Sequence, residues 1–359
     1  GYSALGANTD ETWSRKTSAG TAVMMMDASI TARRNRLING RMRVCQRTAM
    51  PVADNVYALD GMRVVAETAT TGYVVSQELS DLPTSGSRGA VKLAVGASNN
   101  TKAGIFLPVI GSDMWDLRGS VASLQFALKV SNARIGDVRV ALLQWTSTED
   151  AISGDPIANW QAGTSTAITY TTWTSINTPA NISPTTSWVT YTLENQSVSA
   201  SATNLAVLIW NHDITTTAGD YMLITDIQIE KGAVCTAIEA RPLAAVENDC
   251  LSWLQSFGGI NFAIECFGAT SSTTVADCGP LIRTRMRSSP TISLTATDWA
   301  VVEAGSPVTL TTFAQLSTYV TKTGLWSQAT VAAGLTSDRP VFLCNKSAAT
   351  TQLLLSAEP

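Results

Sequence analysis

The sequence is poor in the residues on which many catalytic and metal sites depend. It contains a single histidine, His212, and none of its six cysteines stands in a Cys-x-x-Cys pair. Nucleophilic catalysis that uses histidine as the base would therefore depend on His212 alone. A structural zinc site would lack its usual closely spaced ligand pairs, and no dense Asp/Asn loop indicates a dedicated calcium site. We therefore expect no cofactor and no metal site.

Charge is scarce as well. Charged residues make up 14% of the 359 residues, and the mean hydropathy is +0.11. The net charge of −4 gives no electrostatic reason to bind nucleic acid. No apolar run reaches about 18 residues, so we expect no membrane insertion. The low charge instead predicts that an unusual share of the surface is buried against other chains.

Short apolar stretches with a period of two residues predict strands across most of the chain. Turn-rich segments separate these stretches, and no helical period occurs between residues 60 and 240. One stretch, from Leu205 to Trp210, is apolar on both faces. The pattern predicts a mainly β fold built around a two-sheet jelly roll. The expected strands include residues 121–130, 138–142, 189–193, 205–210 and 221–230.

The boundary between two domains is expected near residue 243. In the strand before it, Tyr221, Leu223, Ile227 and Ile229 lie on one expected face and polar residues on the other. A helix is expected to begin at Pro242 and to continue, with apolar residues at helical spacing, until Gly258-Gly259 ends it.

Beyond the helix we expect a smaller β-rich α+β domain in which the helix covers a sheet. An expected strand at 281–287 places Arg283, Arg285 and Arg287 on one face, which suits an oligomer contact. The predicted domains are residues 1–35, 36–243 and 244–359.

The first predicted domain is an extended N-terminal arm without sustained periodicity. It carries Trp13 and the run Met24, Met25 and Met26, which forms an adaptable apolar patch. Such a segment is either a disordered arm or a peg that docks into another protein. Three methionines and a tryptophan favour docking, so these four residues are the candidate anchoring residues.

Residues 147–187 interrupt the strand pattern with a polar, Thr-rich excursion. A long excursion from a sandwich is usually functional or an interface. Its tryptophans lack apolar neighbours in the sequence, which predicts exposed rings on which a sugar could stack. The alternative is that the rings are buried in the sandwich or in a subunit contact, as tryptophans usually are. The candidate glycan-binding residues are Trp145, Asn159, Trp160, Tyr170 and Trp173.

The chain contains four distinctive segments: NRLINGRMRVCQR at 35–47, VYALDGMRV at 56–64, IQIEKGAVCTAIEARPLAAVENDC at 227–250 and RMRSSPTISL at 285–294. It ends in Ala-Glu-Pro. In this order, the four segments and the chain end resemble those of many bacteriophage virion fibre and appendage proteins. In that family the third segment closes a jelly roll that is similar to carbohydrate-binding modules. The pattern differs at Ile238 and at Cys250-Leu251-Ser252-Trp253.

The resemblance implies a structural protein of a virion, such as a tail fibre, assembled in the host cytoplasm. It implies a homotrimer whose arm contacts other virion proteins and whose jelly roll contacts host surface polysaccharide. The alternatives are a head fibre or decoration protein without a receptor role, and a free carbohydrate-binding or glycan-processing protein. We expect no enzyme, because nothing in the sequence fixes the separation of any two carboxylates as glycoside cleavage requires.

Overall fold

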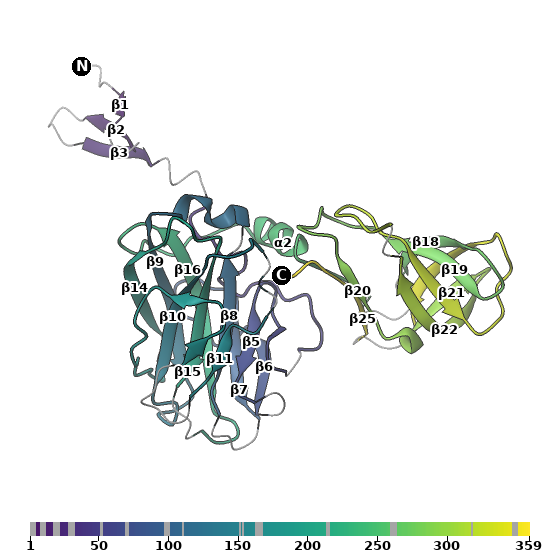
Figure 1. The fold of residues 1–359 in the computed structure, drawn as a ribbon, viewed down its shortest axis with the longest axis horizontal. Coiled ribbons are helices and arrows are strands. Elements are labelled where there is room, and N and C mark those ends of the chain that lie inside the picture. Colours follow the sequence, from purple (N-terminus) through teal and green to yellow (C-terminus); the bar gives the residue numbers. More distant parts are fainter. Residues whose placement is uncertain are drawn as a thin grey trace.

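A computed structural model gives the fold of the chain (Figure 1). It describes residues 5–7, 12–16, 22–27 and 33–359, apart from residues 51, 52, 69–71, 97–100, 110, 151, 153, 162–167, 213–215, 259–263, 317, 318 and 347–350. The predicted fold class, a mainly β chain with a sandwich followed by a smaller β-rich unit, is confirmed. Within the described residues, no helix combines the length and the apolar character needed to cross a membrane.

Two antiparallel sheets form the sandwich. The first has the spatial order β13 (Thr174–Ser175), β10 (Val138–Trp145), β15 (Asn204–Asn211), β8 (Ala103–Val109), β5 (Arg63–Ala66) and β4 (Val56–Tyr57). The second has the order β14 (Val189–Ser197), β9 (Val121–Val130), β16 (Tyr221–Lys231), β7 (Ala90–Val95) and β6 (Tyr73–Glu78). The facing sides of both sheets bury one core, which includes Phe126, Leu128, Ile209 and Ile229.

The first sheet is apolar on its outer face as well. Phe106, Leu208 and Trp210 point away from the main core and belong to a second buried cluster. An apolar outer face must be covered, and the polar excursion supplies part of the cover with the side chains of Ile152, Ile157, Trp160, Ile168 and Trp173. The small ribbon of β11 (Ile157–Asn159) and β12 (Thr169–Tyr170) lies in this cover.

A β-bulge in β16 changes the faces that we expected for this strand. The register with β9 shifts between Thr225 and Gln228, and Asp226 has a φ of 50°. One extra residue reverses the alternation of side chains. Met222 and Ile224 therefore share the core with Ile227 and Ile229, and the expectation for Tyr221 and Leu223 is wrong.

Residues of two of the family-like segments contact each other in the sandwich. The Asn35 amide donates to the Ile227 carbonyl at 2.8 Å, and the Asn35 backbone N–H donates to the Glu239 carboxylate at 2.8 Å. The backbone N–H of Ile227 donates to the Gly40 carbonyl at 2.8 Å. A Cβ atom on Gly40 would lie 2.0 Å from the Ile227 oxygen, so only glycine fits there.

The helix is shorter than expected. Helix α2 (Leu243–Leu251) ends at Ser252, and β17 (Leu254–Gly258) follows it at once. Residues 254–258 pair with β25 (Gln352–Ser356), and Leu254 and Phe257 are buried there. This long-range pairing overrides the local helical spacing. The buried helix residues, Val246 and Cys250, pack on the outer face of the sandwich, so the predicted cover of a C-terminal sheet is wrong.

The C-terminal unit contains a three-stranded sheet and a closed six-stranded barrel. The sheet has the order β17, β25 and β20 (Thr291–Ser293), and it lies between the sandwich and the barrel (Figure 1). Trp299, Val301 and Leu343 are buried in the barrel core. In order, the barrel strands are β18 (Ile264–Thr270), β19 (Val275–Pro280), β23 (Ser327–Val331), β22 (Ser306–Gln315), β21 (Trp299–Glu303) and β24 (Pro340–Asn345).

No strand forms at 281–287, so the predicted arginine face is wrong. The buried amide of Gln255 takes the place of a strand partner in this segment. Its oxygen accepts the Arg283 backbone N–H at 2.9 Å, and its nitrogen donates to the Thr284 carbonyl at 2.7 Å. A side chain thereby satisfies the backbone groups that a sheet would otherwise pair.

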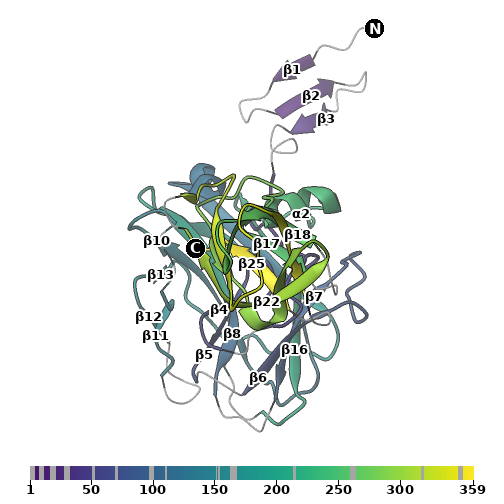
Figure 2. The same ribbon diagram turned by 90° about the vertical axis from the view of Figure 1, so that its right-hand side faces the viewer.

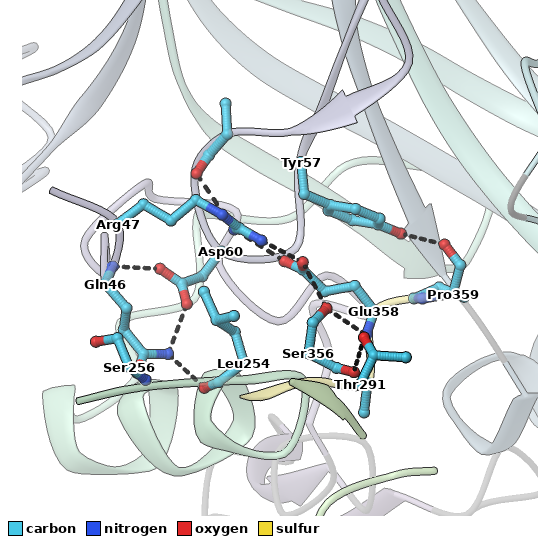
Figure 3. Close-up of polar contacts among 12 residues, drawn as sticks. Gln46, Arg47, Tyr57, Asp60, Leu254, Ser256, Thr291, Ser356, Glu358 and Pro359 are labelled. Carbon is cyan, nitrogen blue, oxygen red and sulfur yellow. Dashed lines mark hydrogen bonds and ion pairs between the residues drawn. The ribbon is translucent and has the colours of Figure 1, made fainter. Parts of the chain in front are cut away.

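Figure 3 shows the seam that joins the sandwich to the end of the chain. Arg47 and Glu358 form an ion pair in which their side chains are only 10% and 3% exposed. The Gln46 side chain donates to the Asp60 carboxylate and to the Leu254 carbonyl, both at 2.7 Å. These contacts connect residues from both folded units, so the seam is a built interface.

At the N-terminus, β1 (Leu5–Ala7), β2 (Thr12–Lys16) and β3 (Ala22–Asp27) form a separate three-stranded antiparallel sheet, seen above the sandwich in Figure 2. The expected absence of periodic structure in residues 1–35 is therefore wrong. The backbones of the candidate anchoring residues belong to β2 and β3. The side chains of Trp13, Met24, Met25 and Met26 lie outside the described residues.

Breaking the seam ion pair should destabilise the protein strongly. The Glu358→Ala substitution leaves the Arg47 charge buried without its partner, and we expect a loss of about 3–5 kcal/mol in unfolding free energy. Replacing both residues, as in Arg47→Met with Glu358→Leu, should restore much of the loss. Lys129→Ala, which breaks the more exposed pair with Asp81, should cost under about 1 kcal/mol. Equal denaturation midpoints for Glu358→Ala and Lys129→Ala would show that the seam is not the stronger contact.

Candidate functional site

The structure buries the two tryptophans that we expected at the surface of the excursion. Trp160 is 7% exposed and Trp173 is 5% exposed. The Trp173 ring lies 5.3 Å from the ring of Phe106 and 5.3 Å from the ring of Trp145. The expectation of exposed rings is therefore wrong, and neither indole offers an open face to a sugar.

Two buried cations fix the excursion to the sheet beneath it. The Lys102 ammonium donates to the carbonyls of Trp160 at 2.9 Å and Gln161 at 2.6 Å, and its burial lowers its pKa. The Arg63 guanidinium donates to the Ile152 carbonyl at 2.8 Å. Because charged groups bind the backbone at these three residues, this part of the excursion is fixed to the sandwich.

The other predicted glycan-binding residues lie nearer the surface. Trp145 is half-buried, and its indole N–H donates to the Thr148 carbonyl at 3.1 Å. Tyr170 packs against the same cluster, and burial raises its pKa to about 12. Asn159 is exposed on the neighbouring strand β11. Trp145 and Tyr170 form the edge of a hydrophobic cluster, and the role of all three residues in glycan contact stays a prediction.

Five exposed large apolar side chains lie on the barrel or beside its strands, and we name these residues the barrel patch. Phe267 is 71% exposed, Leu281 is 79% exposed and Trp326 is 48% exposed. Exposed apolar groups gathered in one region mark protein contacts or ligand sites more often than chance exposure. The patch consists of Ile264, Phe267, Leu281, Tyr319 and Trp326.

Strand register explains why these rings point outward. Phe267 pairs with Gly279 on one side and with Phe342 on the other, while its neighbour Cys266 points into the barrel core. Trp326 precedes Ser327, which is buried and pairs with Cys278. Trp326 therefore lies just beyond the end of this ladder, beside β19 on the side opposite Phe267.

Gly279 allows the Trp326 segment to approach β19 closely. A Cβ atom at residue 279 would lie 2.4 Å from the Leu325 carbonyl oxygen. Any larger residue would push away the segment that carries Trp326. The outer surface here therefore has the Phe267 ring on one side, the Trp326 ring on the other, and no side chain at Gly279 between them.

A polar group at the edge of the barrel patch lacks a partner. Asp277 lies two residues before Gly279 on the outer face of β19. Its Oδ1 atom is shielded from solvent, and among the described residues no group donates to it. A buried acceptor without a donor is costly, so a donor from outside this chain would stabilise it.

The sequence held one signal for the barrel patch. Phe267 follows the alternation Ile264, Glu265 and Cys266, so it falls on the face of the strand that bears the charged Glu265. A large ring on a polar face points to exposure. The β-bulge between Ile264 and Cys266 also places Ile264 on the outer face of the barrel, and no feature of the sequence indicated this bulge.

The chemistry for catalysis or metal binding is sparse in the described residues. No group of three or more His, Cys, Asp or Glu side chains there could hold a metal ion. All six cysteines carry free thiols, and four of them are buried. His212 is fully buried beyond the end of β15 and accepts a hydrogen bond from the Trp210 indole at 3.3 Å.

Comparisons with known proteins concern the sandwich. No protein-family model matches the chain, and no curated protein matches it. Similar solved structures include a putative sugar binding protein from Bacteroides thetaiotaomicron, with 16% identity, a TM-score of 0.34, and coverage of 55% of this chain and 100% of that chain. Another is the C-terminal family 22 carbohydrate binding module of Clostridium thermocellum Xyn10B, with 10% identity, a TM-score of 0.30 and coverage of 51% and 94%.

A third similar structure is the enzymatically active domain of bacteriophage CBA120 tailspike protein 4, with 12% identity, a TM-score of 0.32, and coverage of 52% of this chain and 22% of that chain. All three likenesses are of β fold only.

Removal of the Trp173 ring should test its place in the core. We expect Trp173→Ala to lower the unfolding free energy by about 3–5 kcal/mol, because it empties a packed site between Phe106 and Trp145. Trp115→Ala is the matched control, since that ring is 62% exposed and its main contact is Arg118. It should cost under about 1 kcal/mol. Similar melting temperatures for the two variants would contradict the burial of Trp173.

Proposed function

We propose that this protein is a non-enzymatic structural component of a bacteriophage virion appendage. It forms a homotrimer through the barrel patch, joins the particle through its N-terminal strands and contacts surface polysaccharide. The proposal combines the resemblance of its sequence segments with the surfaces described above.

The barrel patch is the observation that supports the proposal most directly. A monomer would leave Phe267 and Leu281 more than two-thirds exposed, which is unfavourable for such large apolar side chains. A symmetric contact would bury them and could bring a donor to Asp277. The proposed subunit contact still lies in the C-terminal unit. It consists of the outward-facing side chains of the barrel patch, in place of the arginine face of the strand predicted at 281–287.

Two carboxylates that glycoside cleavage could use have cationic partners. Asp150 pairs with Arg287 at 2.8 Å, and Asp220 pairs with Arg134 at 2.6 Å. The Arg134 guanidinium and the Thr217 backbone N–H hold the pKa of Asp220 well below its usual range. A group with such a low pKa is a poor proton donor at neutral pH. These contacts support a protein without catalysis.

The oligomeric state tests the proposal. Light scattering on the whole chain should give three times its mass of 38.0 kDa. Phe267→Ser and Trp326→Ser should weaken or dissociate the trimer, because each removes an apolar group from the barrel patch. Leu79→Ser is the matched control, since Leu79 is 62% exposed on the sandwich, and it should leave the mass unchanged. A monomeric wild-type chain would overturn the homotrimer and favour the alternative of a free carbohydrate-binding protein.

The N-terminal strands should be needed for the particle and not for the fold. Their sheet shares no strand with the sandwich, so deletion of residues 1–27 should leave a folded trimer. The truncated protein should be absent from purified particles. Particles that incorporate it at the normal copy number would refute the anchoring role of this segment.

Host adsorption separates a receptor-binding fibre from a decoration protein without a receptor role. Particles that lack the whole protein should adsorb to cells more slowly if the appendage contacts the host surface. Unchanged adsorption would favour the decoration protein.

A further inference from the structure

A charged cleft lies between the sandwich, helix α2 and the segment before β20. Its volume is about 420 Å³, which is within the range of ligand-binding pockets. The lining combines cations and carboxylates with Ser252 and Trp253. None of the glycan-binding residues predicted from the sequence lies in this cleft.

The inner wall of the cleft is held by internal ion pairs. Arg33 lies 3.4 Å from the Asp113 carboxylate and 3.2 Å from the Asp249 carboxylate. Arg287 lies 2.8 Å from the Asp150 carboxylate and also donates to the Ala357 carbonyl at 2.9 Å. The three carboxylates therefore have fixed positions, and their remaining lone pairs can accept hydrogen bonds.

Two further cations of the lining have no such partner. Among the described residues, no carboxylate lies within ion-pair distance of Arg285 or Lys322, and both side chains are exposed. The backbone N–H of Met286, next to Arg285, donates to the Lys322 carbonyl at 2.8 Å, so the two segments are adjacent. The cleft therefore has a surplus of positive charge in a protein whose net charge is −4.

The two charge types come from different parts of the molecule. Asp113 and Asp150 belong to the sandwich, whereas Arg285 and Lys322 belong to the C-terminal unit. A bound molecule would meet acceptors on one wall and free cations on the other. Inorganic phosphate matches only the wall of cations, because it has few hydroxyl groups to donate to the aspartates on the other wall. A sugar with a carboxylate group suits both walls.

We infer that this cleft is a binding site for an acidic sugar, with its carboxylate on Arg285 and Lys322 and its hydroxyls on the aspartates. A guanidinium binds a carboxylate with two parallel hydrogen bonds, and an ammonium adds a point charge. This inference rests on the proposed function for the source of the sugar, an acidic polysaccharide at a cell surface. It also assigns the contact to the junction of the two units rather than to the excursion.

Calorimetric titration with tetragalacturonate tests the inference, with galactotetraose as the neutral counterpart. The whole protein should bind the acidic oligosaccharide and bind the neutral one at least tenfold more weakly. Arg285→Ala and Lys322→Ala should each weaken binding about tenfold, the loss expected for one charged hydrogen bond. Lys322→Arg should retain binding. Arg339→Ala, which removes an exposed cation outside the cleft lining, should have no effect.

Several outcomes would overturn the inference. These are absence of binding, equal binding of both oligosaccharides, an equal loss in Arg339→Ala, and displacement by an equal concentration of inorganic phosphate. The replaced side chains are exposed and form no ion pair with any described residue, so we expect the variants to fold. Unchanged melting temperatures should confirm this. Titration of Phe267→Ser separates this site from the proposed assembly. If a dissociated Phe267→Ser chain still binds the acidic oligosaccharide, the inference about the cleft holds without the trimer. If the protein is a trimer that binds no acidic oligosaccharide, the inference about the cleft is wrong and the proposed assembly is unaffected.

Discussion

The ion pair between Arg47 and Glu358 is the contact on which the arrangement of the two folded units depends. It joins a residue before the first strand of the sandwich to the residue before the C-terminus (Figure 3). Its partners are buried, so each charge is stable there only because the other is present. The contact fixes β25 beside the sandwich, and β25 in turn holds β17 and β20. The barrel, the cleft and the seam therefore share one scaffold.

The family-like sequence segments meet at this scaffold. Asn35 and Gly40 contact β16, Asp60 accepts from Gln46, and Arg287 reaches the sandwich at Asp150. Each of these residues bonds to the backbone, carries a buried charge or must be glycine, and all of these requirements come from the fold. The resemblance thus reports how the chain is built, and three of these segments also supply lining residues of the cleft.

Much of the fold could be predicted because the strands follow the two-residue period. The errors arose where a distant contact decides the outcome. The bulge at Asp226 reverses the faces of β16 with no mark in the apolar pattern, and pairing with β25 ends the helix before Trp253. The expected exposure of Trp160 and Trp173 was wrong for a related reason. The apolar outer face of β15 required a cover, and Trp160 and Trp173 supply it, although their own segment is polar. The cleft joins residues far apart in the chain, so no local spacing could indicate it.

If three copies of the chain associate through the barrel patch as proposed, their barrels meet at the centre and their sandwiches lie outward. Negative-stain electron microscopy of the purified protein with class averaging tests this arrangement. We expect particles with a compact centre and three larger lobes around it, because the barrel patch then faces inward. Particles with a single large lobe and one smaller lobe, or with sandwiches clustered at the centre and barrels outside, would contradict it.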